Sequence, residues 1–343
     1  MLGALRGSCL TGIASLLPAA PAAAATAGPE TSVAAARPKA SVVCTVSDPR
    51  ITEASGMAVS RKHPGIIYTH NDSGGSPTIF AIGRDGRTRA TFTLAGAGAR
   101  DWEGMALGRD GAGRPALFVA DIGDNMGGAW PYVTVYRVPE PNQLRSQTLR
   151  ATAFRLKYAD GPRNAETVLI DPRTNRLYIA SKLFGGALYA APTRLRTSGF
   201  NVLRKVAGAP AIATDGAFAP DGRSFVIRTY TAAYVYAMSP SRPGKLLRVV
   251  SLPDQRQGES IAYSLDGGSL LAGSEGTDEP VWRIPLPPEA RPTPTPARKA
   301  PTSSKSPAAQ DQPGRRPGGT VLGLALAAGV AMVVAVVVIR RRS

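Results

Sequence analysis

The chain repeats one short pattern five times, and this internal repeat constrains the fold more than any other feature of the sequence. Each copy consists of a polar or acidic residue, a small residue and an apolar strand. The copies begin at Ser55, Glu103, Glu166, Asp215 and Glu259, which lie 48, 63, 49 and 44 positions apart. Four-stranded propeller blades have this spacing, whereas helical hairpin repeats are shorter. The sequence therefore predicts an all-β propeller.

A turn and a second strand follow each copy. In the last four copies the turn contains Asp110-Gly111, Asp171-Pro172, Asp221-Gly222 or Asp266-Gly267, which are pairs that favour tight reversals. The last copy has only three strands, and an unassigned strand at residues 40–46 precedes the first copy. Pairing of this N-terminal strand into the last blade would close the ring. We therefore expect five blades over residues 40–287, or six if the long second repeat contains an extra one.

The two ends of the chain indicate where the body is located. Residues 1–27 resemble a signal peptide, with a positive start at Arg6, an apolar stretch and the small-residue cleavage pattern Ala25-Thr26-Ala27. Residues 320–339 form an uncharged run of 20 residues, which is long enough to cross a hydrocarbon core of about 30 Å. The basic tail, residues 340–343, then indicates a cytoplasmic C-terminus. We expect a single-pass membrane protein whose body is extracellular.

A spacer separates the body from the expected anchor. Residues 288–319 are rich in Pro, Thr, Ser and charged side chains. Such a composition does not form a core and predicts a disordered, semi-rigid linker. The membrane is thus the one partner that the sequence identifies directly, whereas the extracellular ligand or protein partner is left open.

The net charge does not indicate nucleic-acid binding. The formal charge is +17, but residues 287–343 carry nine Lys or Arg against two acids. With Arg6 in the signal peptide, the body retains a charge of +9, spread without any basic run. Nucleic-acid binding requires clustered basic residues, so this class of partner is excluded. Cys44 is the one cysteine expected in the mature chain, which excludes a disulfide framework and favours a small buried apolar side chain.

The propeller topology predicts where a functional site lies. The first strand of each blade lines the central channel and the second runs antiparallel to it, so the start of the first strand and the end of the second meet at one mouth. From the first strands we expect Asp101, Glu103, Glu166, Asp215 and Glu259 at this mouth. From the ends of the second strands we expect His70, Asp72, Asp121, Asp124, Lys182, Arg228 and Tyr230 there.

Like charges gathered at one mouth repel one another and require compensation. Ion pairs with Lys182 and Arg228 in a hydrated channel would provide it. A bound calcium ion would also do so, because calcium takes several carboxylate and carbonyl oxygens. The candidate metal ligands are Asp101, Glu103, Asp121 and Asp124. The candidate residues for a polar or anionic ligand are His70, Asp72, Lys182, Asp215, Arg228 and Tyr230.

Two further hypotheses use the same body differently. As catalytic residues of an extracellular hydrolase, Glu103, Glu166 and Glu259 would supply a neutral acid beside an ionised partner. The substrate would be a phosphate ester, a carboxylic ester or a glycoside, with Trp102 as the aromatic ring nearest the mouth for sugar stacking. The third hypothesis is a protein-interaction scaffold that uses a blade face or edge and needs no channel chemistry.

Six short motifs carry a resemblance to known proteins. They are His70-Asn71-Asp72-Ser73-Gly74, Asp101-Trp102-Glu103-Gly104, Ala120-Asp121-Ile122-Gly123-Asp124-Asn125, Asn164-Ala165-Glu166, Arg228-Thr229-Tyr230 and Gln257-Gly258-Glu259. As a set, over roughly residues 50–280, they resemble a group of secreted bacterial β-propeller proteins. The chain is also loosely similar to phytase-like and esterase-like propellers. The first resemblance implies fold and location, and the phytase-like one implies calcium and phosphate ester hydrolysis.

Overall fold

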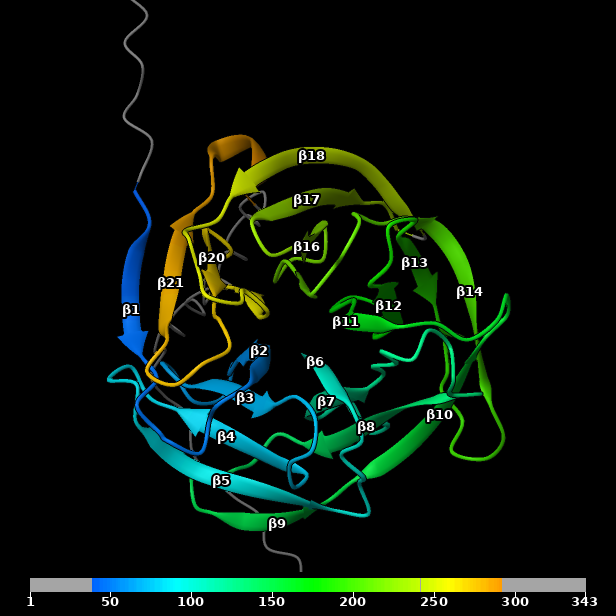
Figure 1. The fold of residues 1–343 in the computed structure, drawn as a ribbon, viewed down its shortest axis with the longest axis horizontal. Helices are drawn as coiled ribbons and strands as arrows, with labels where there is room; N and C mark the ends of the chain where they lie inside the picture. The colour runs from blue at the N-terminus through cyan, green and yellow to red at the C-terminus, as the bar shows by residue number, and fades with distance from the viewer. Residues whose placement is uncertain (1–38, 241, 292–343) are drawn as a thin grey trace, which may run out of the picture. The chain divides into compact units, whose positions relative to one another are not determined.

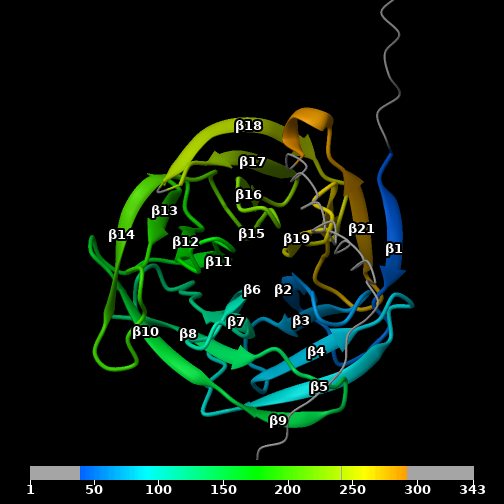
Figure 2. The same ribbon diagram turned by 180° about the vertical axis from the view of Figure 1, so that it is seen from behind.

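The strands of this computed structural model are arranged in small sheets around a central axis (Figure 1). The structure describes residues 39–240 and 242–291, which contain 21 β-strands and one turn of 3-10 helix, η1 (Pro288–Ala290). The first strand of each repeat lies nearest the axis, as the view from behind also shows (Figure 2). The body is therefore all-β and propeller-like.

The hydrogen-bonded order of the strands follows the repeats. The first sheet contains β2 (Ala54–Val59), β3 (Ile67–Asn71), β4 (Thr78–Ile82), β5 (Thr88–Ala95) and β9 (Gln147–Arg150). The second begins with β6 (Trp102–Arg109), β7 (Pro115–Asp121), β8 (Val133–Pro139) and β10 (Thr152–Tyr158) and continues with β14 (Asn201–Gly208), β13 (Ala187–Ala190), β12 (Leu177–Ser181) and β11 (Ala165–Ile170). The third contains β15 (Asp215–Phe218), β16 (Ser224–Arg228), β17 (Ala232–Met238) and β18 (Pro243–Ser251). The fourth contains β19 (Ile261–Tyr263), β20 (Ser269–Ala272), β21 (Pro280–Pro285) and β1 (Ser41–Thr45).

Two pairings explain features that the sequence left open. The strand β1 pairs antiparallel with β21, with Ser41 opposite Arg283, so the N-terminal strand completes the last sheet as predicted. The extra length of the second repeat contains β9, which pairs in parallel with β5 of the preceding sheet. The eight-stranded sheet consists of two antiparallel groups that are joined by the parallel pair β10 and β14.

The burial of each strand reflects its distance from the axis. Inner strands such as β7 and β12 are buried on both faces, which explains why their sequences read as continuous apolar runs. Outer strands such as β5 and β10 alternate between buried and exposed residues, because only one face packs on the core. The predicted Asp-Gly turns are also present, with Gly222 and Gly267 both at a φ of +68°, a conformation that glycine adopts without strain.

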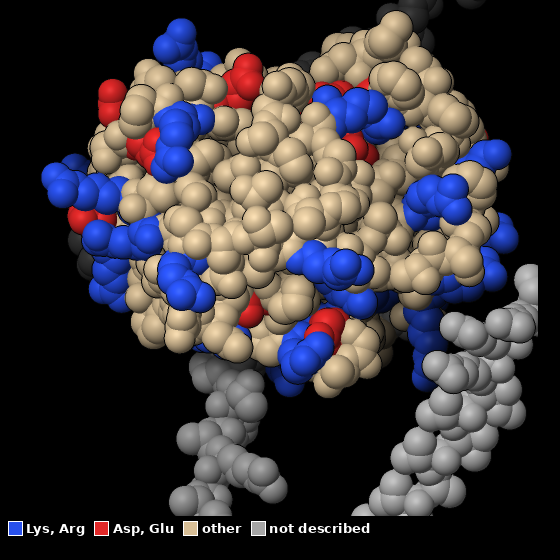
Figure 3. Space-filling view, turned by 90° about the horizontal axis from the view of Figure 1, so that it is seen from below, with Lys and Arg blue, Asp and Glu red and all other residues tan. Residues whose placement is uncertain are grey.

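The core runs between neighbouring sheets and includes Cys44. This side chain is buried among Met57, Ile67, Leu271 and Val281, which confirms its predicted role as a small apolar residue. On the side shown in Figure 3, Lys and Arg side chains are scattered, with Asp and Glu between them.

The predictions for the chain termini concern residues that are mostly outside the described ones. The signal peptide (1–27), the anchor (320–339) and the tail (340–343) lie wholly outside, as does all of the linker beyond residue 291. Within the linker range, η1 packs Ala290 against the apolar cluster that contains Leu252 and Leu286. Among the described residues, no helix is long and apolar enough to span a bilayer.

Candidate functional site

One backbone hydrogen bond recurs at the same place in four repeats and forms the mouth of the channel. In each of these repeats, a residue just after the second strand donates its N–H to the carbonyl of a residue just before the first strand. These bonds run from Asp72 to Glu53, from Gly123 to Asp101, from Lys182 to Asn164 and from Glu275 to Gln257, at 2.9, 3.2, 3.1 and 2.9 Å. The start of each first strand is thereby fixed beside the end of the second, as the topology predicted.

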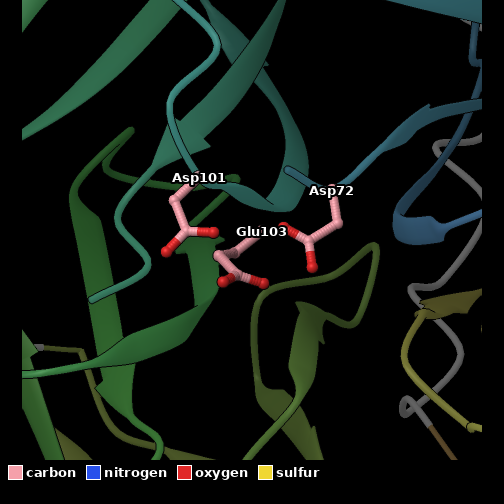
Figure 4. Close-up of side chains that lie close together, drawn as sticks. All are labelled: Asp72, Asp101 and Glu103. Atoms are coloured by element: carbon pink, nitrogen blue, oxygen red, sulfur yellow. The ribbon is translucent and has the colours of Figure 1, made fainter. Parts of the chain in front are cut away.

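Three carboxylates converge at this mouth. Asp72 follows β3, Asp101 precedes β6, and Glu103 lies on β6. One oxygen from each residue lies within 4.8 Å of the others, and the three side chains point toward one another (Figure 4). We call these residues the carboxylate triad. Two of its members, Asp101 and Glu103, were predicted metal ligands, whereas Asp72 was assigned to ligand binding.

The triad has carboxylate oxygens that are free to bind a cation, and a glycine beside it leaves room for them. Glu103 is only 2% exposed, and its Oε1 and the Oδ1 of Asp72 have no hydrogen-bond partner among the described residues. Gly123 lies directly against the triad. A Cβ at this position would lie 2.3 Å from Asp101 Oδ2 and 2.3 Å from Glu103 Oε1. The glycine therefore leaves room for the carboxylates to converge.

The electrostatics of the triad are unfavourable without a counter-charge. Burial, followed by the charges of Asp101 and Glu275, raises the pKa of Asp72 to about 8. Burial and the neighbouring Glu166 raise the pKa of Glu103 well above its ordinary range. Burial also raises the pKa of Asp101, although Arg100 opposes the shift. Protons or a cation on these groups would relieve the unfavourable charge.

A second group lies beside the triad and contains a lysine. The Lys182 ammonium pairs with Glu166, lies 4.0 Å from Glu259 Oε1 and sits 5.2 Å from the centre of the Tyr230 ring. Burial lowers the pKa of Lys182, but Glu166 and Glu259 outweigh it and raise the pKa overall. Burial and Glu259 raise the pKa of Glu166 to about 9 despite the lysine.

The two groups form one electrostatic unit. The charge of Asp72 contributes to the raised pKa of Glu166, and Glu259 contributes to that of Asp72. Burial and Glu259 also raise the pKa of Glu275 to about 7. We call this unit the acidic mouth, and its carboxylates are Asp72, Asp101, Glu103, Glu166, Glu259 and Glu275. Lys182 is the lysine that contacts them.

Asp121 and Asp124, also predicted as metal ligands, lie outside the triad. Asp121 accepts the N–H of Asp101 at 3.0 Å and lies 3.6 Å from Arg100. The Asp124 carboxylate accepts the N–H groups of Ala129 and Trp130 at 3.1 and 3.0 Å. Both side chains therefore shape the loops around the mouth, where Asp121 Oδ1 and both oxygens of Asp124 are engaged.

Arg228, predicted to bind a ligand, instead joins two sheets. It is fully buried, and an arginine has five N–H donors. The guanidinium donates to the carbonyls of Thr229, Ser260, Gly273 and Tyr230 and to Gln255 Oε1. These five bonds use every donor, so none is available to a ligand. The sequence predicted that Arg228 lies near the mouth. It could not predict the hydrogen bonds of Arg228, because four of the five acceptors are backbone carbonyls.

Asp215 and His70 are buried in the walls of the channel. Asp215 accepts the N–H of Ile261 at 2.8 Å, which ties β15 to the start of β19. His70 packs edge-on against Trp102 at 5.5 Å between ring centroids, and burial lowers its pKa to about 4. This histidine is therefore neutral at physiological pH. Trp102 is buried in the same core, so the expectation that it stacks on a sugar is wrong.

Sequence reasoning missed Gly123 as a component of the site. The signal was present, because Gly123 occupies the repeat position held elsewhere by Asp72, Lys182 and Glu275. A glycine among charged equivalents indicates a position where a side chain would obstruct its neighbours.

Comparisons with known proteins add little. No protein-family profile and no curated protein matches the chain. Among solved structures, a gluconolactonase of Xanthomonas campestris is similar at 14% identity and a TM-score of 0.43, over 71% of this chain and 79% of that one. A likeness at this level carries no argument about the reaction, so the function must be inferred from the site.

Proposed function

We propose that this protein is a calcium-binding β-propeller of the cell surface, with the cation held by Asp72, Asp101 and Glu103. The observation that carries this proposal is the convergence of three carboxylates, among them Glu103, which is 2% exposed and whose Oε1 has no hydrogen-bond partner among the described residues. An isolated buried carboxylate is costly, and the cost is removed by a proton or a metal. Calcium prefers carboxylate oxygens and tolerates irregular geometry.

The charge balance of the acidic mouth supports a divalent ion. Six carboxylates lie there, whereas the ammonium of Lys182 is engaged by Glu166 and Glu259. Burial raises the pKa of Asp101 and Arg100 lowers it, but the Arg100 guanidinium also lies 3.6 Å from Asp121 and is shared with that carboxylate. A divalent cation would neutralise two of the three triad charges.

The proposal also includes the location and the architecture. The sheets and half-sheets that begin with β2, β6, β11, β15 and β19 would be five blades, closed by β1. The signal peptide would export this body, and the helix at 320–339 would hold it at the outer face of the membrane. A protein at that location meets calcium at concentrations that sites of modest affinity can bind.

Calcium titration of the full-length chain, purified in detergent and stripped with a chelator, tests the proposal. We expect saturable heat in calorimetry and a raised unfolding temperature, because a ligand that binds only the native state stabilises it. Glu103→Gln should abolish both effects. Asp254→Asn, at an exposed aspartate outside the acidic mouth, is the matched control. Absence of saturable binding by the parent chain would show that protons alone neutralise the triad.

A hydrolase is the second candidate, and the pKa of Glu166 favours it. A carboxyl with a pKa of about 9 is neutral at pH 7 and able to donate a proton, with Glu259 as its partner and with Lys182 and Tyr230 to hold a polar substrate. Screening of phosphate esters, carboxylic esters and glycosides with the calcium-loaded chain tests this function. Glu166→Gln should abolish turnover and leave calcium binding at the triad in place.

A further inference from the structure

Large apolar side chains are exposed on one side of the acidic mouth. They lie in the loops that follow β7, β12 and β16, at residues 122–132, 182–186 and 229–231. Phe184 is 89% exposed and Met126 is 77% exposed. The exposed apolar residues in these loops are Met126, Trp130, Tyr132, Leu183, Phe184 and Tyr230. We call this set the apolar crescent.

The apolar crescent belongs to the same mouth as the carboxylates. Leu183 directly follows Lys182, and the Lys182 ammonium lies over the Tyr230 ring. The Arg100 guanidinium stacks on Trp130 at 4.5 Å and lies near Asp121. The corresponding loops of the first and last sheets, residues 72–77 and 273–279, carry Ser, Gly, Pro, Thr and acidic residues instead. The mouth is thus polar on one side and apolar on the other.

The two most exposed side chains share a local sequence. Met126 precedes Gly127-Gly128, and Phe184 precedes Gly185-Gly186. A Cβ at Gly127 or Gly185 would meet no atom within 4 Å, whereas one at Gly128 or Gly186 would lie 2.8 or 2.4 Å from a backbone carbonyl oxygen, so the second glycine anchors each loop and the first one, beside the exposed side chain, is open to solvent. Exposed apolar groups that gather on one surface indicate an interaction site. Because Phe, Met and Leu offer no hydrogen bond and are exposed here, they suit a fluid apolar phase better than a sugar.

The cation at the triad would have free coordination positions. Calcium takes six to eight oxygens, whereas the triad brings one oxygen from each of three side chains within 4.8 Å. Phosphate oxygens can occupy the remaining positions. Arg256, which is exposed in the loop before β19, adds positive charge on the same face and favours an anionic surface.

We propose that the acidic mouth and the apolar crescent together bind an anionic phospholipid bilayer. Calcium on the triad bridges lipid phosphates, while Phe184, Leu183 and Met126 enter the interface between headgroups and acyl chains. This inference rests on the proposed calcium site. It gives the body a second membrane contact, independent of the expected C-terminal anchor.

Vesicle flotation tests the inference on the full-length chain. The chain is carried in nanodiscs of phosphatidylcholine and mixed with vesicles of phosphatidylcholine, with or without phosphatidylglycerol. We expect flotation only with phosphatidylglycerol and calcium, and its loss in chelator. The double variant Phe184→Ser with Met126→Ser should weaken flotation by about tenfold to a hundredfold, since each apolar side chain contributes to insertion. Leu246→Ser, on an exposed position of β18, is the control and should leave flotation unchanged.

Two accompanying measurements distinguish a failure of calcium binding from a failure of lipid binding. Calorimetry without vesicles reports calcium binding by itself, and the double variant should retain it. If calcium does not bind, the proposed function fails; if calcium binds and the vesicles do not float, only the lipid inference is overturned. Glycerol 3-phosphate serves as a soluble competitor. If it displaces the vesicles and the double variant floats like the parent, the mouth is a site for small phosphates and the lipid inference is wrong.

Discussion

Replacement of Asp72 by asparagine separates the effect of protons from that of calcium at the mouth. In the folded chain the pKa of Asp72 is raised from 3.8 to about 8, first by burial and then by Asp101 and Glu275. Between these pH values the native state binds a proton that the unfolded state has released. The free energy of unfolding is therefore highest at low pH and falls as the pH rises toward 8, by about 1.4 kcal/mol per pH unit from this group.

The size of the effect follows from the pH range. From pH 5 to pH 8 a fully shielded carboxyl would lose about 4 kcal/mol, and we expect roughly 2–3 kcal/mol because solvent reaches part of Asp72 and screens its charge. An asparagine side chain does not titrate, so Asp72→Asn should lack this loss. In chelator at pH 8 the variant should be the more stable protein. Calcium at about 100 times its dissociation constant should add roughly 2.7 kcal/mol to the parent and much less to the variant.

Denaturant unfolding of the full-length chain in detergent, followed by tryptophan fluorescence, measures these differences. Parent and variant are compared from pH 5 to pH 8, in chelator and in calcium, with Asp254→Asn as the control. Parallel pH curves for parent and Asp72→Asn in chelator would show that Asp72 is already ionised at neutral pH, and the reasoning would be refuted.

Three further predictions concern neighbouring features. Gly123→Ala should weaken calcium binding in calorimetry by about tenfold to a hundredfold, because its Cβ would displace the triad carboxylates; Gly185→Ala, with open space around it, should bind like the parent. Arg228→Met should lower the free energy of unfolding by about 3 kcal/mol, because five hydrogen bonds are lost, whereas the exposed Arg256→Met should have little effect in the same denaturant assay. Calcium affinity should rise with pH up to about 8, the pKa of Asp72, and calorimetry at pH 7 in buffers of different ionisation enthalpy should detect proton release on binding; equal heats in all buffers would contradict this.

The fold could be predicted well from the sequence, because each repeat combines local signals that agree. The Asp-Gly and Asp-Pro turns, the apolar inner strands and the repeat spacing of 44 to 63 residues all indicate the same four-stranded unit. Strand β9 could not be predicted. Gln147–Arg150 is short and polar, and its parallel pairing with β5 depends on where the rest of the chain places the two segments.

The sequence predicted where the site lies better than it predicted what each side chain does there. Topology indicated that Glu103, Glu166 and Glu259 would gather with Lys182, and the structure brings them together. The predicted topology did not indicate which hydrogen-bond donors and acceptors are already used within the protein. The engagement of Arg228 and Asp124 depends on backbone groups of neighbouring loops, and the type of a residue carries no information about such partners.

The pairing of β1 with β21 has a consequence for the proposed export. Ser41 lies near the start of the body and Arg283 near its end, so in an exported chain the ring could not close until almost the entire body had crossed the membrane. Until then β1 has no partner, and an open strand edge invites pairing with other chains. Contacts between residues this far apart also form slowly. A chain that emerges N-terminus first would therefore stay open throughout its passage, and its closure would depend on protection outside the cell during that interval.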